Sequence, residues 1–148
     1  MEELTHTDST GKARMVDISE KEVQIRSAKA SGHIKLTPET LGLIKDNTIK
    51  KGDVLTVAQL AGINAAKQTP LLIPLCHNIL LNNIKVDLIP DESGISARSE
   101  VSTIGRTGAE MEALTAVSVA LLTVYDMCKA VDRMMVIDKI LLTEKTKI

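Results

Sequence analysis

Apolar and polar residues follow two different spacings along this chain. Four segments alternate loosely or form short apolar runs, as β-strands do, and three segments repeat apolar residues at helical spacing. The expected strands are residues 22–36, 79–89, 95–103 and 135–143, and the expected helices are residues 38–45, 54–67 and 110–131.

Two of the expected helices begin at recognisable capping residues. Thr37 and Pro38 are typical of the N-cap and first helical position, and Asp53 is a candidate N-cap for the second helix. The helix at 54–67 is apolar over most of its surface, so we expect it to be buried or to lie in an interface. The helix at 110–131 is apolar almost all round and should pack centrally.

Two segments without helical or strand spacing connect these elements. Pro70 and Pro74 bracket TPLLIPLCHN (69–78), which we expect to be a loop. An apolar loop is unusual on the surface of a monomer. The segment PDESG (90–94) predicts a hairpin turn, with Gly94 available for a positive φ.

The order of elements indicates the fold class. A strand, two helices, two hairpin strands, a long helix and a final strand match a split βαβ pattern with an inserted helix. The prediction is an α+β fold with helices packed on one face of an antiparallel sheet. The polar residues 1–14 are expected to form a flexible N-terminal arm, and residues 15–148 one domain.

Composition narrows the possible functions. The chain has 18 basic and 19 acidic residues, a net charge of −1, one Tyr, and neither Phe nor Trp. This balance argues against electrostatic capture of nucleic acid or of an anionic membrane, and the lack of aromatics argues against base stacking. We expect no membrane span and no secretory signal. Cys76 and Cys128 form no CxxC motif, so we expect a reducing cytoplasm.

Charged residues inside apolar segments are the first candidates for chemistry, because a charge there must be paired or used. Asp126 and Lys129 share a face of the long helix at i, i+3 spacing, and we expect this pair to be half-buried. A carboxylate beside an ammonium in a dry site has the shifted pKa values that proton transfer requires. Lys51, Lys67 and His77 complete a possible anion site. Taken singly, each lysine is more typical of a solvated surface lysine, and His77 is at least as typical of a hydrogen-bonded core histidine.

Two short motifs have competing interpretations. Cys76-His77 invites a zinc interpretation, but His6 and His33 form no spaced ligand pair with it, so we expect no metal site. The segment GRTG (105–108) could form an anion-binding nest or resemble the loop of KH RNA-binding domains. It follows an expected strand rather than a helix, and carboxylates follow it, so the RNA interpretation is disfavoured.

Four segments together resemble one known family. They are ARMVDISEK (13–21), KGDVLTVAQLAGINAAKQTP (51–70), LIPLCH (72–77) and GRTGAEMEALTAVSVALLTVYDMCKAVDR (105–133). These long motifs are similar to the cyclic pyranopterin monophosphate synthase family of molybdenum-cofactor biosynthesis. The resemblance spans residues 15–145.

The resemblance implies a fold, an assembly and a reaction. The fold would be ferredoxin-like, and the assembly a homohexamer, a trimer of dimers with active sites at subunit interfaces. The substrate would be 3′,8-cyclo-7,8-dihydro-GTP, which is converted to cyclic pyranopterin monophosphate with release of pyrophosphate. This lyase reaction involves no redox change, so we expect no cofactor, although Mg²⁺ could enter with the triphosphate.

The resemblance also implies site residues. The catalytic positions would be Asp126, Lys51 and Lys129, with both lysines in proton transfer and Asp126 orienting or deprotonating Lys129. The remaining positions would bind substrate, with His77 and Glu112 on the base and Arg26 and Lys67 on the triphosphate. The implied substrate-binding residues are Leu75, Cys76, His77, Met111, Glu112, Lys67 and Arg26.

The chain departs from the family pattern at a few places. Gln68 stands where a basic residue is usual, Asn78 where Pro is usual, and Met134 where Gly is usual. The sequence ends at KTKI (145–148), where most relatives continue into a Gly- and Lys-rich tail. The implied catalytic positions are intact, so we expect an active enzyme in which Asn78 and the short C-terminus affect substrate affinity.

Two further functions compete with the enzyme. A nucleotide-binding sensor of ferredoxin-like fold would bind GTP-like ligands without turnover, but it has no need of the Asp126–Lys129 pair. A purely structural oligomer subunit would leave the charges inside apolar segments unexplained.

Overall fold

The computed structural model describes residues 5–148 and contains one four-stranded sheet with three helices. The chain order is β1 (Gln24–Lys35), α1 (Pro38–Lys45), α2 (Val54–Leu72), β2 (Leu81–Pro90), β3 (Gly94–Gly105), α3 (Glu110–Cys128) and β4 (Val136–Lys147). The strand order in space is β2-β3-β1-β4, and every neighbouring pair is antiparallel. This arrangement confirms the expected α+β fold with a split βαβ topology.

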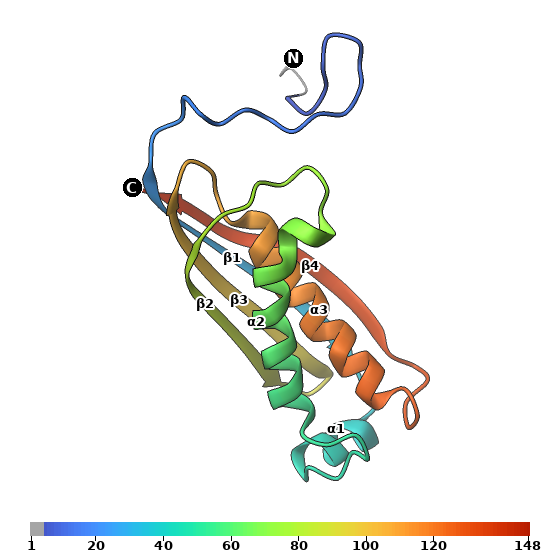
Figure 1. The fold of residues 1–148 in the computed structure, drawn as a ribbon. Coiled ribbons are helices and arrows are strands. Elements are labelled where there is room, and N and C mark those ends of the chain that lie inside the picture. Colours follow the sequence, from blue (N-terminus) through green and yellow to red (C-terminus); the bar gives the residue numbers. More distant parts are fainter. Residues whose placement is uncertain (1–4) are drawn as a thin grey trace.

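The long helices α2 and α3 lie side by side on one face of the sheet, while α1 sits at one end (Figure 1). Alternate residues of β1, such as Ala28, Ala30 and Ile34, are buried against that helical layer. On α3, Val117 and Leu121 point into the same core. The sequence alternation in β1 therefore translates directly into one apolar face and one polar face.

Small residues set the closeness of these layers. A Cβ added to Gly32 in β1 would lie 2.8 Å from Leu121 Cδ1 of α3. A Cβ on Gly62 of α2 would lie 3.0 Å from the Ala116 carbonyl oxygen of α3. Any larger side chain would push α3 away from its neighbours, so these glycines hold the helices at their short separation.

Both predicted N-caps are present. The Thr37 hydroxyl accepts from the backbone N–H of Thr40, and the Asp53 carboxylate accepts from the N–H of Thr56. These side chains satisfy donors that the first helical turn cannot pair internally. The starts of α1 and α2 were therefore predictable from single residues.

Three predicted boundaries were wrong. The helix expected at 54–67 continues as α2 to Leu72, with Pro70 inside it, so the expected loop at 69–78 is shorter. Proline removes one helical N–H but its φ suits a helix. The helix expected to reach residue 131 ends at Cys128, whose carbonyl oxygen accepts from the N–H groups of residues 131 and 132. The last strand extends to Lys147 because it pairs with β1 along its length.

The N-terminal segment runs over one end of the helical layer (Figure 1). Residues 1–4 of the expected flexible arm lie outside the described residues. Residues 5–14 contain a bridge between Thr7 and Ala13, and the Asp8 carboxylate accepts from the N–H groups of Thr10 and Lys12. The flexibility of the arm stays a prediction.

By length and composition, α3 could cross a membrane. In this fold it packs against α2 and the sheet, and most of its apolar residues are buried. Such a helix is typical of a protein core.

Candidate active site

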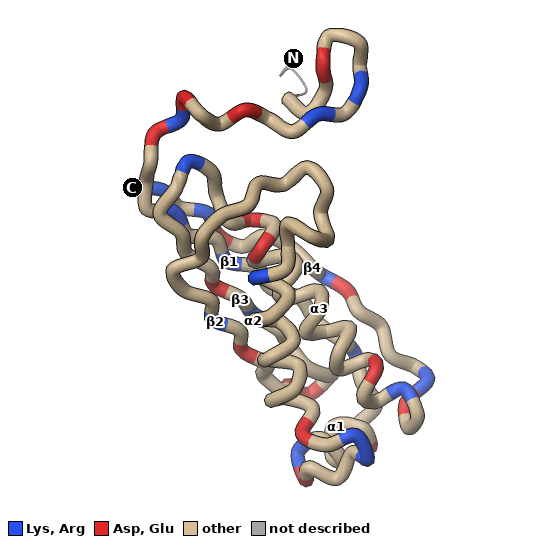
Figure 2. The backbone as a smooth tube through the Cα atoms, in the orientation of Figure 1, with Lys and Arg blue, Asp and Glu red and all other residues tan. Residues whose placement is uncertain are grey.

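Charged side chains gather at the two ends of the α2–α3 pair, whereas most of the length of both helices carries none (Figure 2). One end holds Lys51, Asp126 and Lys129, which we call the lysine–aspartate cluster. The other end holds a cavity beside His77, which we call the His77 pocket. These two regions contain most of the residues that the sequence singled out.

The lysine–aspartate cluster joins the start of α2 to the end of α3. Lys51 Nζ lies 3.1 Å from Asp126 Oδ2, and Lys129 Nζ lies 2.8 Å from Asp126 Oδ1. Lys51 Nζ also donates to the Asp126 carbonyl oxygen at 3.3 Å. Gly52, with φ +110°, makes the turn that places Lys51 there, a conformation that favours glycine. The carboxylate thus holds one ammonium on each oxygen.

The electrostatics of this cluster keep its charges in place. The hydrogen bonds from Lys129 and Lys51 lower the pKa of Asp126, and the bond to Asp126 raises the pKa of Lys129. Two ammonium groups around one carboxylate leave the region positive, which suits an anionic ligand.

The predicted half-burial of the Asp126–Lys129 pair was wrong for the single chain. The Asp126 side chain is 56% exposed and that of Lys129 is 58% exposed. Another protein surface would have to cover this ion pair to exclude water from it.

The His77 pocket has a volume of about 340 Å³ and lies at the start of α3. Five of the implied substrate-binding residues line it together. They are Leu75, Cys76, His77, Met111 and Glu112. The segment after α2 supplies the first three, and the first turn of α3 supplies the other two. Two motifs 34 residues apart therefore meet in one wall, although their roles stay a prediction.

His77 and Cys76 have distinct chemical states in this pocket. His77 Nε2 lies 2.5 Å from the Val16 carbonyl oxygen. A carbonyl can only accept, so Nε2 carries the hydrogen. Burial raises the pKa of the Cys76 thiol, and the nearby Glu112 carboxylate adds to this effect. Cys76 is therefore a protonated thiol near neutral pH and a poor nucleophile.

Glu112 is the buried carboxyl of the pocket, only 3% exposed. Burial raises its pKa, and the charge of Glu110 acts in the same direction. The oxygens of a buried carboxyl can accept hydrogen bonds from a ligand. This property suits recognition of a heterocycle edge.

Glu110 behaves differently although it lies two residues away. Its carboxylate pairs with Lys145 Nζ of β4 at 2.7 Å. Burial is the largest single effect and raises the pKa of Glu110. The hydrogen bond from Lys145, a backbone hydrogen bond and the charges of Lys145 and Arg26 together outweigh burial, so the pKa of Glu110 is lowered. A Cβ at Gly108 would collide with this carboxylate, so the glycine leaves room for it. The ion pair ties the C-terminal strand to the pocket.

The other two implied binding residues lie outside this lining. Lys67 lines an adjoining cavity of about 170 Å³, which shares Glu112 with the pocket. Arg26 is buried in β1, where its Nε donates to the Gly105 carbonyl oxygen at 3.1 Å and its guanidinium to Gln24 Oε1 at 3.2 Å. Arg26 is thus engaged in holding the ends of β1 and β3.

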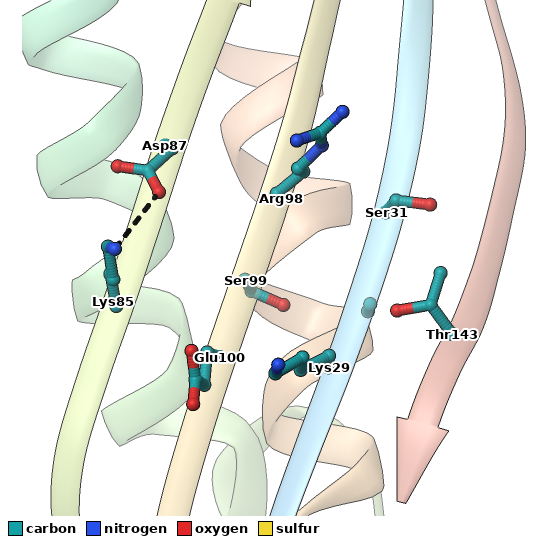
Figure 3. Close-up of a pocket in the computed structure, with 9 residues that line it drawn as sticks. Lys29, Ser31, Lys85, Asp87, Arg98, Ser99, Glu100 and Thr143 are labelled. Carbon is teal, nitrogen blue, oxygen red and sulfur yellow. Dashed lines mark ion pairs between the residues drawn. The ribbon is translucent and has the colours of Figure 1, made fainter.

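Another hollow, of about 490 Å³, lies on the open face of the sheet. Figure 3 shows Lys85 and Asp87 paired on β2 of this face, 3.8 Å apart. Lys29 pairs with Glu144 of β4 at 2.9 Å. Because these charges neutralise one another on an open surface, we do not assign the site here. Within residues 5–148, no three His, Cys, Asp or Glu side chains converge as metal ligands.

The two candidate regions are far apart within one chain. Glu112 lies in the first turn of α3 and Asp126 in its last turn. At 1.5 Å per residue their backbones are separated by roughly 21 Å along the helix. A small molecule would have to span most of this distance to contact both regions of a single chain.

Several lining residues of the His77 pocket were missed by sequence reasoning. The N-terminal segment supplies Thr5, His6, Val16, Ile18 and Lys21, and the β3–α3 turn supplies Thr107, Gly108 and Glu110. The turn had a weak signal in its two glycines. The family motif at 13–21 marked part of the N-terminal segment, but only the fold brings that segment to the pocket.

Comparisons with known proteins find one family. A family model described as the MoaC family matches residues 15–147. A Methylobacterium protein named cyclic pyranopterin monophosphate synthase is 57% identical over 148 residues, 99% of this chain and 92% of the relative. Cyclic pyranopterin monophosphate synthase 1 of Mycobacterium tuberculosis is 56% identical over 144 residues, 97% of this chain and 85% of the relative. The Clostridium acetobutylicum synthase is 54% identical, covering 98% and 91%.

Proposed function

The chain belongs to the MoaC family, and we propose that it is a cyclic pyranopterin monophosphate synthase, a lyase of molybdenum-cofactor biosynthesis. It converts 3′,8-cyclo-7,8-dihydro-GTP to cyclic pyranopterin monophosphate and releases pyrophosphate. The observation that carries this conclusion is the identity of at least 54% over nearly the whole chain to relatives with that name.

The lysine–aspartate cluster supplies the proton-transfer groups of this proposal. Lys129 has a raised pKa and is protonated at neutral pH, so it first acts as a proton donor when the ring opens. Lys51, held on the other carboxylate oxygen, faces the same space. Asp126 stays ionised and positions both ammonium groups.

The His77 pocket holds the heterocycle. The Glu112 oxygens can accept hydrogen bonds from polar edges of the base, and the thiol of Cys76 stays uncharged beside them. Leu75 and Met111 supply apolar contacts to the ring faces. His77 is assigned to the same end of the substrate, while Lys67 approaches from the adjoining cavity.

A second copy of the chain completes the site. The two regions are too far apart in one chain, so a partner must bring its lysine–aspartate cluster to the first copy's pocket. The outer faces of α2 and α3 expose apolar residues that such a partner would cover. These are Val57, Leu60, Leu71, Leu72, Leu122 and Tyr125. We propose that this pairing is the dimer within a homohexamer.

The proposed reaction needs no cofactor, because no electrons are gained or lost. Mg²⁺, where it takes part, arrives with the phosphate chain of the substrate. The ligand is a small molecule, and no nucleic acid or membrane is involved. The two cysteines are free thiols, which agrees with a cytoplasmic location.

Product analysis tests this function directly. The purified protein is incubated with 3′,8-cyclo-7,8-dihydro-GTP while pyrophosphate release and the fluorescence of the oxidised pterin are followed, with Lys51→Ala in parallel. Product from the native protein and little from Lys51→Ala is the expected result. Tight substrate binding without product would show that the protein is a nucleotide-binding sensor and not an enzyme.

A further inference from the structure

The N-terminal segment at residues 15–21, which we call the strap, forms part of the wall of the His77 pocket. Val16, Ile18 and Lys21 of the strap line the cavity together with the helix-start residues of α3. The strap precedes β1 in the chain and crosses the end of the helical layer (Figure 1). The rest of the described lining comes from α3 and its preceding turn, from the segment after α2, and from Thr5 and His6.

The strap has a defined internal structure. The Asp17 carboxylate accepts from the backbone N–H of Ser19 at 2.9 Å and from its hydroxyl at 2.6 Å. The N–H of Lys21 donates to the Ile18 carbonyl oxygen at 3.0 Å. The hydrogen bonds from Ser19 lower the pKa of Asp17, so this turn is maintained at neutral pH.

Two contacts fasten the strap to the rest of the protein. At one end His77 Nε2 donates to the Val16 carbonyl oxygen. At the other end Arg106 Nε donates to the Lys21 carbonyl oxygen at 3.1 Å. His77 belongs to the segment after α2 and Arg106 to the β3–α3 turn, so the strap is attached to both segments that build the pocket.

The charges in the pocket wall require a cation for an anionic ligand. Glu110 and Glu112 both line the cavity, and the Lys145 ammonium is already engaged by Glu110. Among the described residues of the lining, Lys21 is the single lysine or arginine. Arg26, the residue implied for the triphosphate, is buried and donates to Gly105 and Gln24 instead.

We infer that Lys21 binds the phosphate chain of the substrate, and that His77 and Arg106 are positioning residues that hold the strap over the bound ligand. This inference rests on the proposed function and names a further binding residue of that site. Because these two contacts hold the segment that carries Lys21, losing either contact should weaken phosphate binding.

Calorimetric titration with inorganic pyrophosphate tests Lys21 without requiring turnover. Lys21→Met should weaken pyrophosphate binding roughly ten- to hundredfold, the usual effect of losing one charged hydrogen-bonding partner. Lys21→Arg should restore most of the affinity. Lys12→Met, on the same N-terminal segment but outside the pocket lining, should bind as the native protein does.

Steady-state kinetics with the cyclised GTP substrate provide the second measurement. Lys21→Met should raise KM by a similar factor and leave kcat within about threefold, because phosphate binding is made before and during the reaction alike. Arg106→Met should raise KM by a smaller factor, since it frees the strap but keeps the ammonium. Melting curves establish that all variants fold.

The outcomes separate this inference from the proposed function. Equal pyrophosphate affinity in Lys21→Met and Lys12→Met would overturn the role of Lys21, as would a loss of kcat at unchanged KM or no pyrophosphate binding by the native protein. If the native protein makes no pterin while its pyrophosphate affinity depends on Lys21, the synthase function fails and the phosphate site stands.

Discussion

The two ends of the α2–α3 pair differ in how their charges are treated. At the lysine–aspartate cluster the charges are solvent-exposed and satisfy each other across one carboxylate. In the His77 pocket Glu112 is buried, and a separate chain segment roofs the cavity. The first arrangement keeps groups charged and ready to give protons. The buried arrangement in the His77 pocket excludes water and admits ligands of matching shape.

This difference indicates which property each end contributes. An exposed ion pair adds little to folding, so its residues are free to serve chemistry. A buried carboxyl costs folding free energy and is retained where binding needs it. Substitutions at the exposed end should therefore lower activity with little effect on stability, whereas substitutions at the buried end should change stability.

The largest expected effect is at the exposed end. Lys129→Ala should lower kcat by roughly 10²–10⁴-fold, the usual contribution of a general acid or base. The free energy of unfolding should change by less than about 0.5 kcal/mol, because the pair is solvent-exposed. Turnover at saturating substrate and urea unfolding measure the two quantities. Lys45→Ala, a lysine in the last turn of α1, is the matched control. A normal kcat in Lys129→Ala would refute the catalytic assignment.

Combining the two ends in different copies tests whether they meet across an interface. Lys129→Ala and Glu112→Ala proteins should each be inactive alone. Co-expressed at equal levels, they should recover about a quarter of native activity, since half of randomly formed dimers would contain one intact site of two. Product formation by the mixed assembly, against each parent mixed with itself, measures this. No recovery would mean that each copy uses both ends of its own chain.

At the buried end, a neutral replacement should stabilise the protein. Burial raises the pKa of Glu112 above its ordinary 4.5, so the folded state holds its proton more tightly than the unfolded chain. Stability is then lost as pH rises through 4.5 toward the folded-state pKa. Glu112→Gln should remove this loss and raise the unfolding free energy at pH 7 by up to about 1 kcal/mol. Urea unfolding between pH 4 and 8 measures it.

Glu110→Gln is the contrasting variant for that experiment. The pKa of Glu110 is lowered by Lys145, so its stabilising effect is present above the unfolded-state pKa and is lost as pH falls. The substitution should therefore lower stability at pH 7, opposite to Glu112→Gln. Equal signs for the two variants would mean that these neighbouring carboxyls share one environment.

The smallest expected effect is at the N-cap of α2, next to the lysine–aspartate cluster. Asp53→Ala removes the side-chain cap of α2, two residues after Lys51, and should cost about 1 kcal/mol of unfolding free energy. Activity should fall only slightly, since Gly52 still makes the turn. Thermal unfolding measures the loss. Glu92→Ala, in the hairpin turn, should stay within about 0.5 kcal/mol of native.

Local sequence patterns predicted the fold well because they act over a few residues. Alternation identified β1, helical spacing identified α3, and Thr37 and Asp53 marked helix starts. The same local rules failed at Pro70, which signals a break by propensity but lies inside α2, two residues before the helix ends.

The candidate site was predicted in pieces rather than as a whole. The i, i+3 spacing brought Asp126 and Lys129 together, as the helix repeat requires. The family motifs named Cys76, His77 and Glu112, which the fold gathers into one pocket. Nothing local could indicate that Arg26 would be engaged with strand-end groups, because that depends on the register between β1 and β3.

By itself, the sequence determined the order and type of the elements, the helix caps and the charge-bearing motifs. Only the tertiary structure decided that Lys51 meets Asp126 across 75 residues of chain and that Lys21 reaches the pocket. It also decided that the cluster and the pocket lie at opposite ends of the helices. Spacing and capping depend on near neighbours, whereas these contacts depend on how the sheet and both helices pack together.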